Sequence, residues 1–167
     1  MLGDGGARVW GLSTHGQAQA KIDGGDVALP RGRRCVGLGL GAFHSLALLD
    51  DGRILQWGTP PLGTRSDDPV PVELGQAGRA VSVAAGWWHS AAAGVNGELW
   101  TWGSDGAVGC TVGEGGGGGR LGRGLAWIGG TDVRSPTRVH LPGGWRALSV
   151  ACGPASTAVL VEEGEGE

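Results

Sequence analysis

The sequence predicts an all-β fold, a partial β-propeller in which about three four-stranded blades form an open arc. Two recurring blocks predict this fold. Trp-Gly occurs at 10–11, 57–58 and 102–103, in steps of 47 and 45 residues. Gly-x-x-His-Ser occurs at 41–45 and 86–90, again with a step of 45. A period of about 40–50 residues with several short strands in each unit is typical of propeller blades.

A third block gives the units a common internal spacing. Pro-x-x-Val-x-Leu begins at Pro69 and at Pro136, and each proline lies 17 residues before a glycine, Gly86 or Gly153. The pentapeptide 153–157 is therefore interpreted as a diverged Gly-x-x-His-Ser block. We divide this single repeat domain (1–167) into a half blade and loop (1–23), a repeat (24–58), a second repeat (69–103), a Gly-rich insertion (104–135), a half-degenerate repeat (136–161) and an acidic tail (162–167).

Each complete unit is expected to contain four short strands and little helix. In the second unit the strands are predicted at residues 70–74, 81–85, 89–93 and 98–102. Asn96-Gly97 is a strong two-residue hairpin signal, and Asp51-Gly52 and Asp4-Gly5 occupy the equivalent turns. The Ala- and Val-rich strand at 81–85 suits the crowded inner position of a blade. No stretch shows an apolar stripe of helical period over several turns.

The insertion interrupts the regular spacing by 22 residues relative to the preceding unit. Its five consecutive glycines, 115–119, are expected to form a mobile surface loop, because ordering them would cost conformational entropy without side-chain contacts in return. Trp127 lies in an apolar stretch of the same insertion. It either packs back onto a blade or is exposed for a partner.

Composition excludes several classes of partner. The net charge is −3, so the chain has no basic field for direct nucleic-acid binding, and the cluster Arg31–Arg34 is interpreted as a solvated turn. An odd number of cysteines without a CxxC pair fits a reducing compartment. No signal peptide and no apolar run of membrane-spanning length is present. We expect an intracellular protein, cytoplasmic or nuclear, without a membrane partner.

The sequence predicts neither catalysis nor a cofactor. In His44-Ser45 and His89-Ser90, neighbouring side chains of a strand point to opposite faces, so neither pair can form a Ser–His dyad within itself. We interpret the recurring His as a structural hydrogen-bonding residue that ties a blade to the neighbouring loop. The four histidines follow the repeat spacing without a metal-binding motif, so no metal site is expected. The paired carboxylates are interpreted as solvated turns.

Comparison of the copies separates structural positions from individual ones. Trp10 is grouped with Trp57 and Trp102 as a structural tryptophan. Trp87 and Trp88 replace Ala42 and Phe43 of the earlier copy, and exposed Trp is typical of binding hot spots. The predicted partner-binding residues are therefore Trp87, Trp88 and Trp127. The predicted structural repeat positions are Gly41, His44, Trp57, Gly58, Gly86, His89, Trp102 and Gly103.

The Gly-x-x-His-Ser and Trp-Gly blocks resemble the repeat of the regulator of chromosome condensation family. The stretch 10–17, Trp-Gly-Leu-Ser-Thr-His-Gly-Gln, is also similar to that repeat. The resemblance covers nearly the whole chain except the insertion, and it implies a seven-bladed propeller of which about three blade equivalents are present. Three explanations remain open: a partial gene product, a diverged minimal member, or arcs that self-associate through their open blade edges.

The resemblance implies more than one function. The preferred one is a non-catalytic scaffold that holds a protein partner, such as a small GTPase or a chromatin protein. The alternative is guanine-nucleotide exchange on a small GTPase, with residues 113–130 as the candidate wedge. A second alternative is Trp-based ultraviolet-B sensing. It is suggested because Gly86-Trp87-x-His89-Ser90 is similar to a string in the plant ultraviolet-B photoreceptor of this family, although Trp88 stands where that string has Arg.

Overall fold

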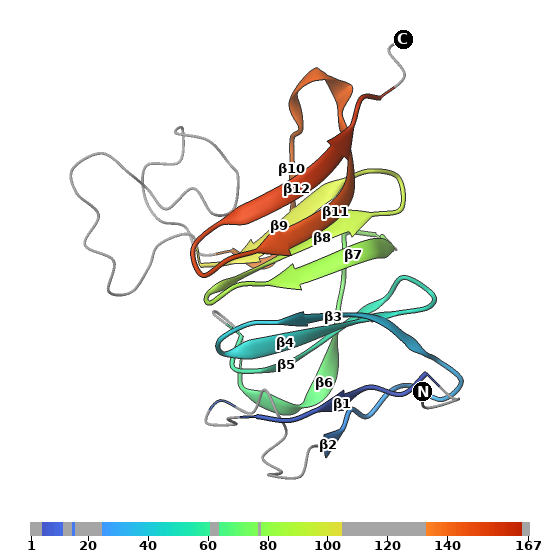
Figure 1. Ribbon diagram of the computed structural model, residues 1–167, viewed down its shortest axis with the longest axis vertical. Coiled ribbons are helices and arrows are strands. Elements are labelled where there is room, and N and C mark those ends of the chain that lie inside the picture. The colour runs from blue at the N-terminus through green and yellow to red at the C-terminus, as the bar shows by residue number, and fades with distance from the viewer. Residues whose placement is uncertain are drawn as a thin grey trace, which may run out of the picture.

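The described part of the chain is an open arc of antiparallel sheets. The computed structural model describes residues 5–11, 15, 25–60, 64–76, 78–104 and 133–164. Within these ranges the elements are twelve β-strands and one short 3-10 helix, which confirms the all-β prediction. None of the described residues forms a helix long and apolar enough to cross a membrane. Figure 1 shows the sheets following one another from β1–β2 at one end to β11–β12 at the other.

Two four-stranded sheets form the centre of the arc. The first contains, in spatial order, β3 (Cys35–Leu40), β4 (His44–Leu49), β5 (Ile54–Gly58) and β6 (Ser66–Val72). The second contains β7 (Ala80–Ala85), β8 (His89–Gly94), β9 (Leu99–Gly103) and β10 (Val133–Val139). The four strands predicted for the second unit, at 70–74, 81–85, 89–93 and 98–102, lie within a few residues of β6, β7, β8 and β9.

Each end of the arc carries a two-stranded sheet. One consists of β1 (Arg8–Val9) and β2 (Gly25–Asp26), and the other of β11 (Arg146–Cys152) and β12 (Thr157–Glu162), with the 3-10 helix η1 (Pro142–Gly144) before it. The inner strands β3, β7 and β11 contact one another in succession, so they form the inner edge of the arc.

The sheets and the sequence units are out of phase by one strand. The Pro-x-x-Val block lies in β6, yet β6 pairs with β5 of the preceding unit, with Val70 opposite Gln56. In the same way β10 pairs with β9, with Arg138 opposite Trp100. The fourth strand of each sheet is therefore supplied by the following unit. The insertion joins β9 to β10 of one sheet, and its residues 105–132 lie outside the described ranges.

Three apolar clusters hold successive sheets together. Trp57 is buried between the first sheet and β1–β2, with Val9 and Ala47 among its neighbours. Trp102 is buried between the two four-stranded sheets, where Leu46 and Leu48 belong to the same cluster. Ala, Val and Leu side chains form the third cluster, between the second sheet and β11–β12. Fully burying a Val or Leu side chain contributes about 1.5–3 kcal/mol.

The third tryptophan of the series corrects the sequence interpretation. Trp10 was grouped with Trp57 and Trp102 as structural, but 71% of its surface is exposed. Its two counterparts are buried because the preceding sheet covers each of them, β1–β2 for Trp57 and β3–β6 for Trp102. Trp10 follows β1, and the sheet to which β1 belongs consists, among the described residues, of β1 and β2. The position is structural in the two complete sheets alone.

The hairpin turns connect each sheet to the next one. The turn glycines Gly5, Gly52 and Gly97 have positive φ angles of 69°, 81° and 84°, which glycine adopts without the steric penalty of a side chain. Their carbonyl oxygens accept hydrogen bonds of 2.9, 2.8 and 2.8 Å from the N–H groups of Cys35, Ala80 and Ala147, which lie in the following inner strands. The same backbone link thus occurs at each of the described junctions.

Candidate interaction site

The loops between the first and second strands of each sheet form one rim of the arc, here called the loop rim (residues 41–44, 86–89 and 153–156). Successive loops approach closely at their glycines. A Cβ added to Gly41 would overlap the Gly86 carbonyl oxygen, and a Cβ on Gly86 would lie 2.7 Å from the Gly153 carbonyl oxygen. The repeated glycine therefore sets the distance between neighbouring loops.

A buried histidine links the two four-stranded sheets behind this rim. His44 Nε2 lies 2.7 Å from Ser90 Oγ, and both side chains are fully buried. In the next copy, His89 Nε2 lies 3.2 Å from the carbonyl oxygen of Ser156. The serine partner of His44 thus comes from the following repeat, a pairing that the sequence analysis did not consider. Both side chains are shielded from solvent, and their contact connects the two sheets.

Burial also sets the charge of His44. Desolvation, together with the proximity of His89, lowers the pKa of His44 to about 4. Burial disfavours the imidazolium form because a charge loses its hydration in the interior. His44 is therefore neutral at pH 7, and it contributes to the junction through its hydrogen bond and its packing.

Aromatic side chains form a stack on the surface of the loop rim. The rings of Phe43 and Trp88 have centroids 4.1 Å apart at an angle of 31°, and His15 meets Phe43 edge-on at 4.7 Å. Trp88 is half-buried in this arrangement, whereas its neighbour Trp87 is 53% exposed. The backbone N–H of Trp87 donates a 3.4 Å hydrogen bond to the Pro154 carbonyl oxygen. Trp87 and Trp88 are thus adjacent at the surface, and Trp127 lies outside the described ranges.

Two of these stacking partners were not predicted. Phe43 occupies the same repeat position as Trp88, so the repeat spacing could have shown that the two rings lie in adjacent loops. The contact of His15 with Phe43 could not be found in this way, because His15 does not belong to a Gly-x-x-His-Ser block.

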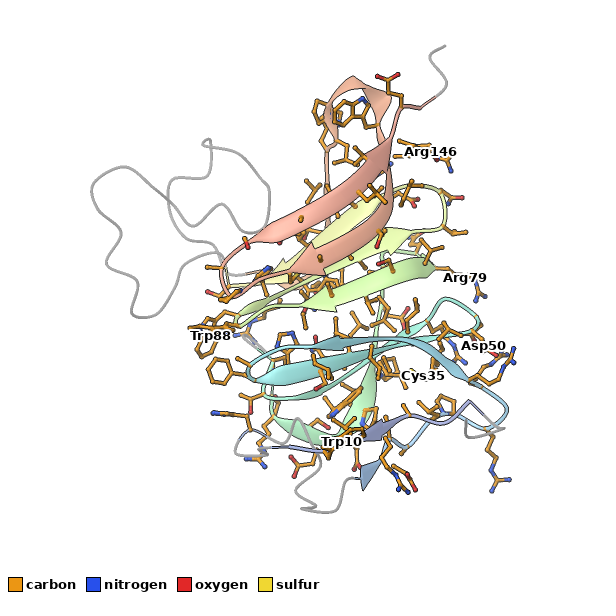
Figure 2. The ribbon with its side chains drawn as sticks, in the orientation of Figure 1. Trp10, Cys35, Asp50, Arg79, Trp88 and Arg146 are labelled. Carbon is orange, nitrogen blue, oxygen red and sulfur yellow. The ribbon has the colours of Figure 1, made fainter. Side chains whose placement is uncertain are left out.

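The hairpin turns around Gly5, Gly52 and Gly97 form the opposite rim, here called the turn rim, which carries charged side chains. Figure 2 shows Asp50, Arg79 and Arg146 at this edge and Trp88 at the other. Arg33 and Arg34 pair with Asp50, at 3.8 and 3.3 Å. The predicted solvated turn 31–34 is therefore exposed but ion-paired. Arg79 donates a hydrogen bond to the Asp51 carbonyl oxygen.

Arginines also control the ionisation of Asp51. Burial by itself raises the pKa of Asp51, but hydrogen bonds from Arg53 and the charges of Arg53 and Arg33 outweigh it and hold this pKa below its usual value. The nitrogen–oxygen distances are 2.8 Å for Arg53 and 3.2 Å for Arg33. These charged side chains of the turn rim thus form ion pairs with one another.

The described cysteines offer little reactivity. Cys35 and Cys152 are free thiols. Burial raises the pKa of Cys152 to about 11, with a hydrogen bond to Thr157 acting in the opposite direction, and burial also raises the pKa of Cys35. Both thiols are therefore protonated at neutral pH. Among the described residues no group of three or more His, Cys, Asp or Glu side chains is arranged to hold a metal ion.

Comparison with known proteins supports the resemblance. The family model of the regulator of chromosome condensation (RCC1) repeat matches residues 80–109, which include β7, β8 and β9. The human E3 ubiquitin-protein ligase HERC2 is 32% identical over 171 residues, covering 92% of this chain. The chain is a regulator of chromosome condensation repeat protein. The mitochondrial RCC1 domain-containing protein RUG3 of Arabidopsis thaliana is 38% identical over 80 residues, or 44% of the chain.

Solved structures with RCC1 repeats show the same fold. Human WBSCR16 superposes with a TM-score of 0.75 at 23% identity, covering 96% of this chain and 41% of that one. Prp20p of Saccharomyces cerevisiae gives a TM-score of 0.67 at 21% identity, covering 90% of this chain and 38% of that one. The RCC1-repeat chain spans only 3% of HERC2 and 18% of RUG3. The activities of those whole proteins therefore do not transfer with the match.

Proposed function

We propose that this RCC1-repeat chain is a non-catalytic scaffold whose loop rim binds a protein partner through Trp87 and Trp88. The observation that carries the proposal is the half-exposed Trp87 beside a Trp88 that is already stacked on Phe43. Trp is enriched among the residues that dominate binding energy at interfaces. Side chains already held in place lose less conformational entropy on binding, which favours affinity.

The charge distribution supports a protein rather than a nucleic acid as the partner. The net charge is −3. Arg33, Arg34 and Arg53 on the turn rim face Asp50 and Asp51 rather than open solvent alone. Basic side chains that are paired in this way are less available for contacts with phosphates. We place such a partner, and the chain itself, inside the cell.

The related structures suggest which partners to test first. Prp20p is described with its binding properties to Gsp1p and histones, and a second structure holds Kap60 bound to Prp20. These are protein partners of a protein with the same fold. We therefore propose a small GTPase or a histone as the first probes for this chain.

The test compares three single substitutions. Each variant is immobilised, and its dissociation constants for a small GTPase and for core histones are measured by titration. Trp87→Ala and Trp88→Ala should each weaken binding of the responding probe by about tenfold or more, as expected for hot-spot residues. Trp145→Ala is the matched control, because Trp145 is also exposed (43%) but follows η1 outside the loop rim. Equal affinities of Trp87→Ala and Trp145→Ala for the same probe would show that the loop rim is not the binding surface.

The two alternative functions have no comparable observation in their favour. Nucleotide exchange was assigned to residues 113–130, which lie outside the described ranges. Ultraviolet sensing was assigned to Trp87 and Trp88. The ring contact described for Trp88 is with Phe43 and not with a second tryptophan. A GTPase-loading assay and a measurement of oligomer mass under ultraviolet light test these alternatives directly.

A further inference from the structure

Ser135 lies in a Ser-Pro sequence on β10, the outer strand of the second sheet. The stretch 134–138 reads Arg-Ser-Pro-Thr-Arg. A serine followed directly by proline, with a basic residue three positions after the serine, is the pattern that proline-directed protein kinases modify. Proline suits its position because it has no N–H group that would need a partner in the kinase, and arginine supplies donors for acidic groups there. One other proline of the chain follows a hydroxyl residue, in Thr59-Pro60.

The backbone around Ser135 belongs to a strand but stands outside its ladder. The register of β10 shifts between Val133 and Thr137, and the three residues between them stand opposite Trp102 alone. In the four-stranded order of this sheet, β10 is the outermost strand. Residues of such a bulge are not held by ladder hydrogen bonds. Ser135 can therefore enter the cleft of a kinase with little loss of pairing in the sheet.

Thr59, the other hydroxyl residue before a proline, has different surroundings. It is half-buried, and its Oγ1 donates a 3.1 Å hydrogen bond to the His15 carbonyl oxygen. Its N–H group donates a 2.7 Å bond to the Phe43 carbonyl oxygen. The third residue after it is leucine rather than arginine. Ser135, by contrast, is exposed, and its hydroxyl has no hydrogen-bond partner within the described part of the chain.

The first sheet carries a negative charge at the position that Ser135 occupies in the second. The Pro-x-x-Val-x-Leu blocks align Asp68 of β6 with Ser135 of β10. Asp68 is exposed, and the register of β6 also shifts beside it, between Gln56 and Gly58 of the paired strand. An anion at this position is therefore compatible with the fold.

A hollow of about 490 Å³ between β6 and β10 brings hydrogen-bond donors to the same place as Ser135. Gln56 and Arg134 line it together with Ser135, and Glu73 is a lining residue of opposite charge. Trp102 Nε1 donates a 3.1 Å hydrogen bond to Gln56 Oε1, which leaves the amide N–H groups of Gln56 as donors for another partner. Arg134 is exposed and forms no ion pair with the carboxylates that the structure describes. Guanidinium groups bind phosphate oxygens strongly.

We propose that Ser135 is a phosphorylation site for a proline-directed kinase and that Arg134 and Gln56 bind the added phosphate. In this reaction Ser135 Oγ attacks the γ-phosphorus of ATP, and a new phosphorus–oxygen bond forms. The bond from the γ-phosphorus to the oxygen that bridges it to the β-phosphate breaks, ADP leaves, and the hydroxyl proton passes to a base of the kinase.

Phosphorylation changes the charge between the two central sheets. The charges of Arg134 and Glu73 in the hollow cancel, and phosphoserine adds a charge of about −1.5 to −2 at neutral pH. The hollow then carries a net negative charge, which distinguishes the two forms of the protein for any partner at this surface. The site lies apart from Trp87 and Trp88, so the proposal does not depend on binding at the loop rim.

Incubation of the 167-residue chain with ATP and a cyclin-dependent kinase bound to its cyclin tests the site. Tandem mass spectrometry should locate one phosphate at Ser135, and Ser135→Ala should lose it. Thr59→Ala is the matched control and should be phosphorylated like the unsubstituted chain. Arg138→Ala should slow the reaction by about tenfold, as expected for the loss of one charge-assisted contact with the kinase. The proposal is overturned by a chain that takes up no phosphate, by phosphate at Thr59, by phosphorylation that persists in Ser135→Ala, or by an unchanged rate in Arg138→Ala.

Phosphorus NMR titration of the phosphorylated chain tests how the phosphate is bound. Free phosphoserine loses its second proton near pH 6, and contacts with Arg134 and Gln56 should lower this pKa by about half a unit or more, because they favour the dianion. Arg134→Leu and Gln56→Leu, each phosphorylated to completion, should recover part of the shift. Arg65→Ala is the control, since Arg65 lies beside the bulge of the first sheet and its removal should leave the pKa unchanged. An unshifted pKa in the unsubstituted chain, or an equal shift in all three variants, would overturn the proposed binding of the phosphate.

Discussion

The turn rim and the loop rim of the arc use the repeat in different ways. On the turn rim, each described copy has the same elements: a glycine carbonyl that accepts a bond from the next inner strand, and an arginine, Arg34, Arg79 or Arg146, packed against that glycine. On the loop rim the glycine recurs, but the two residues after it are Ala-Phe, Trp-Trp and Pro-Ala in the three copies.

The comparison separates the residues that join the sheets from those that can vary. The sheets are joined at the loop rim by the close approach of Gly41 and Gly86 and by the His44–Ser90 hydrogen bond, of which Gly86, His44 and Ser90 are buried and Gly41 is half-buried. The two residues between the glycine and the histidine of each copy do not form these junction contacts. Binding specificity can change there without disturbing the fold, and the paired Trp residues of the second copy occupy this position.

The largest effect is expected from adding a methyl group at a loop-rim junction. In Gly86→Ala the Cβ would overlap the His89 ring and lie 2.7 Å from the Gly153 carbonyl oxygen, so we expect a loss of about 3 kcal/mol in the free energy of unfolding. Gly37→Ala is the control, because its Cβ would meet Leu48 at an ordinary 3.4 Å, and the change should stay below about 1 kcal/mol. Urea denaturation measures both. Equal stabilities would mean that the glycine does not set the spacing of the loops.

The buried histidine predicts loss of stability in acid. The folded-state pKa of His44 is about 4, below its ordinary value of 6.5, so the unfolded chain binds more protons between these values. Its contribution is complete above pH 6.5 and is lost as the pH falls toward 4. We expect about 2 kcal/mol less stability at pH 5 than at pH 7.5 from this group. Urea titrations at both values should show a smaller decrease for His44→Gln, and an identical decrease would contradict the assignment.

A smaller effect should come from the aromatic stack on the loop rim. A double-mutant cycle of Phe43→Ala and Trp88→Ala should give a coupling energy of about 1 kcal/mol, because the rings are in direct contact. The cycle of Phe43→Ala with Trp145→Ala should show none, since Trp145 follows η1 outside the loop rim. Additive effects of Phe43 and Trp88 would mean that the stack does not hold Trp88 in place.

The smallest effect is expected at the turn rim. Arg79→Ala removes a hydrogen bond to the Asp51 carbonyl oxygen, but the group is exposed, so the expected loss is about 0.5 kcal/mol. Arg65→Ala, which removes an exposed 3.0 Å pair with Asp67 elsewhere, should behave similarly. Thermal unfolding measures both variants. A loss above that of Gly86→Ala would reverse the comparison of the two rims.

The repeat spacing predicted much of the architecture because the fold depends on positions that recur. Gly41, Gly86, Trp57 and Trp102 could be identified as a set, and the strands of the second unit lie close to their predicted positions. The same spacing could not show which unit supplies the fourth strand, because β6 and β10 carry no signal for the side on which they pair.

Contacts between copies were harder to predict than the copies themselves. A strand argument correctly separates His44 from Ser45, but only the three-dimensional arrangement brings His44 to Ser90. Trp10 was misjudged for the same reason, since its sequence matches Trp57 while its surroundings do not. The proposed binding residues Trp87 and Trp88 were selected because they differ from the repeat, and the structure explains how Phe43 holds one of them.

The phase difference between sheets and sequence units has a consequence for unfolding. Because β6 belongs to the first sheet while β7, a few residues later, belongs to the second, the stretch 69–103 contributes strands to both. One unit cannot melt alone, since its loss would strip the outer strand from the preceding sheet. The two sheets therefore depend on each other for their strands. We expect the amide hydrogens of β5 and β9 to exchange with solvent together, in a single cooperative opening rather than unit by unit.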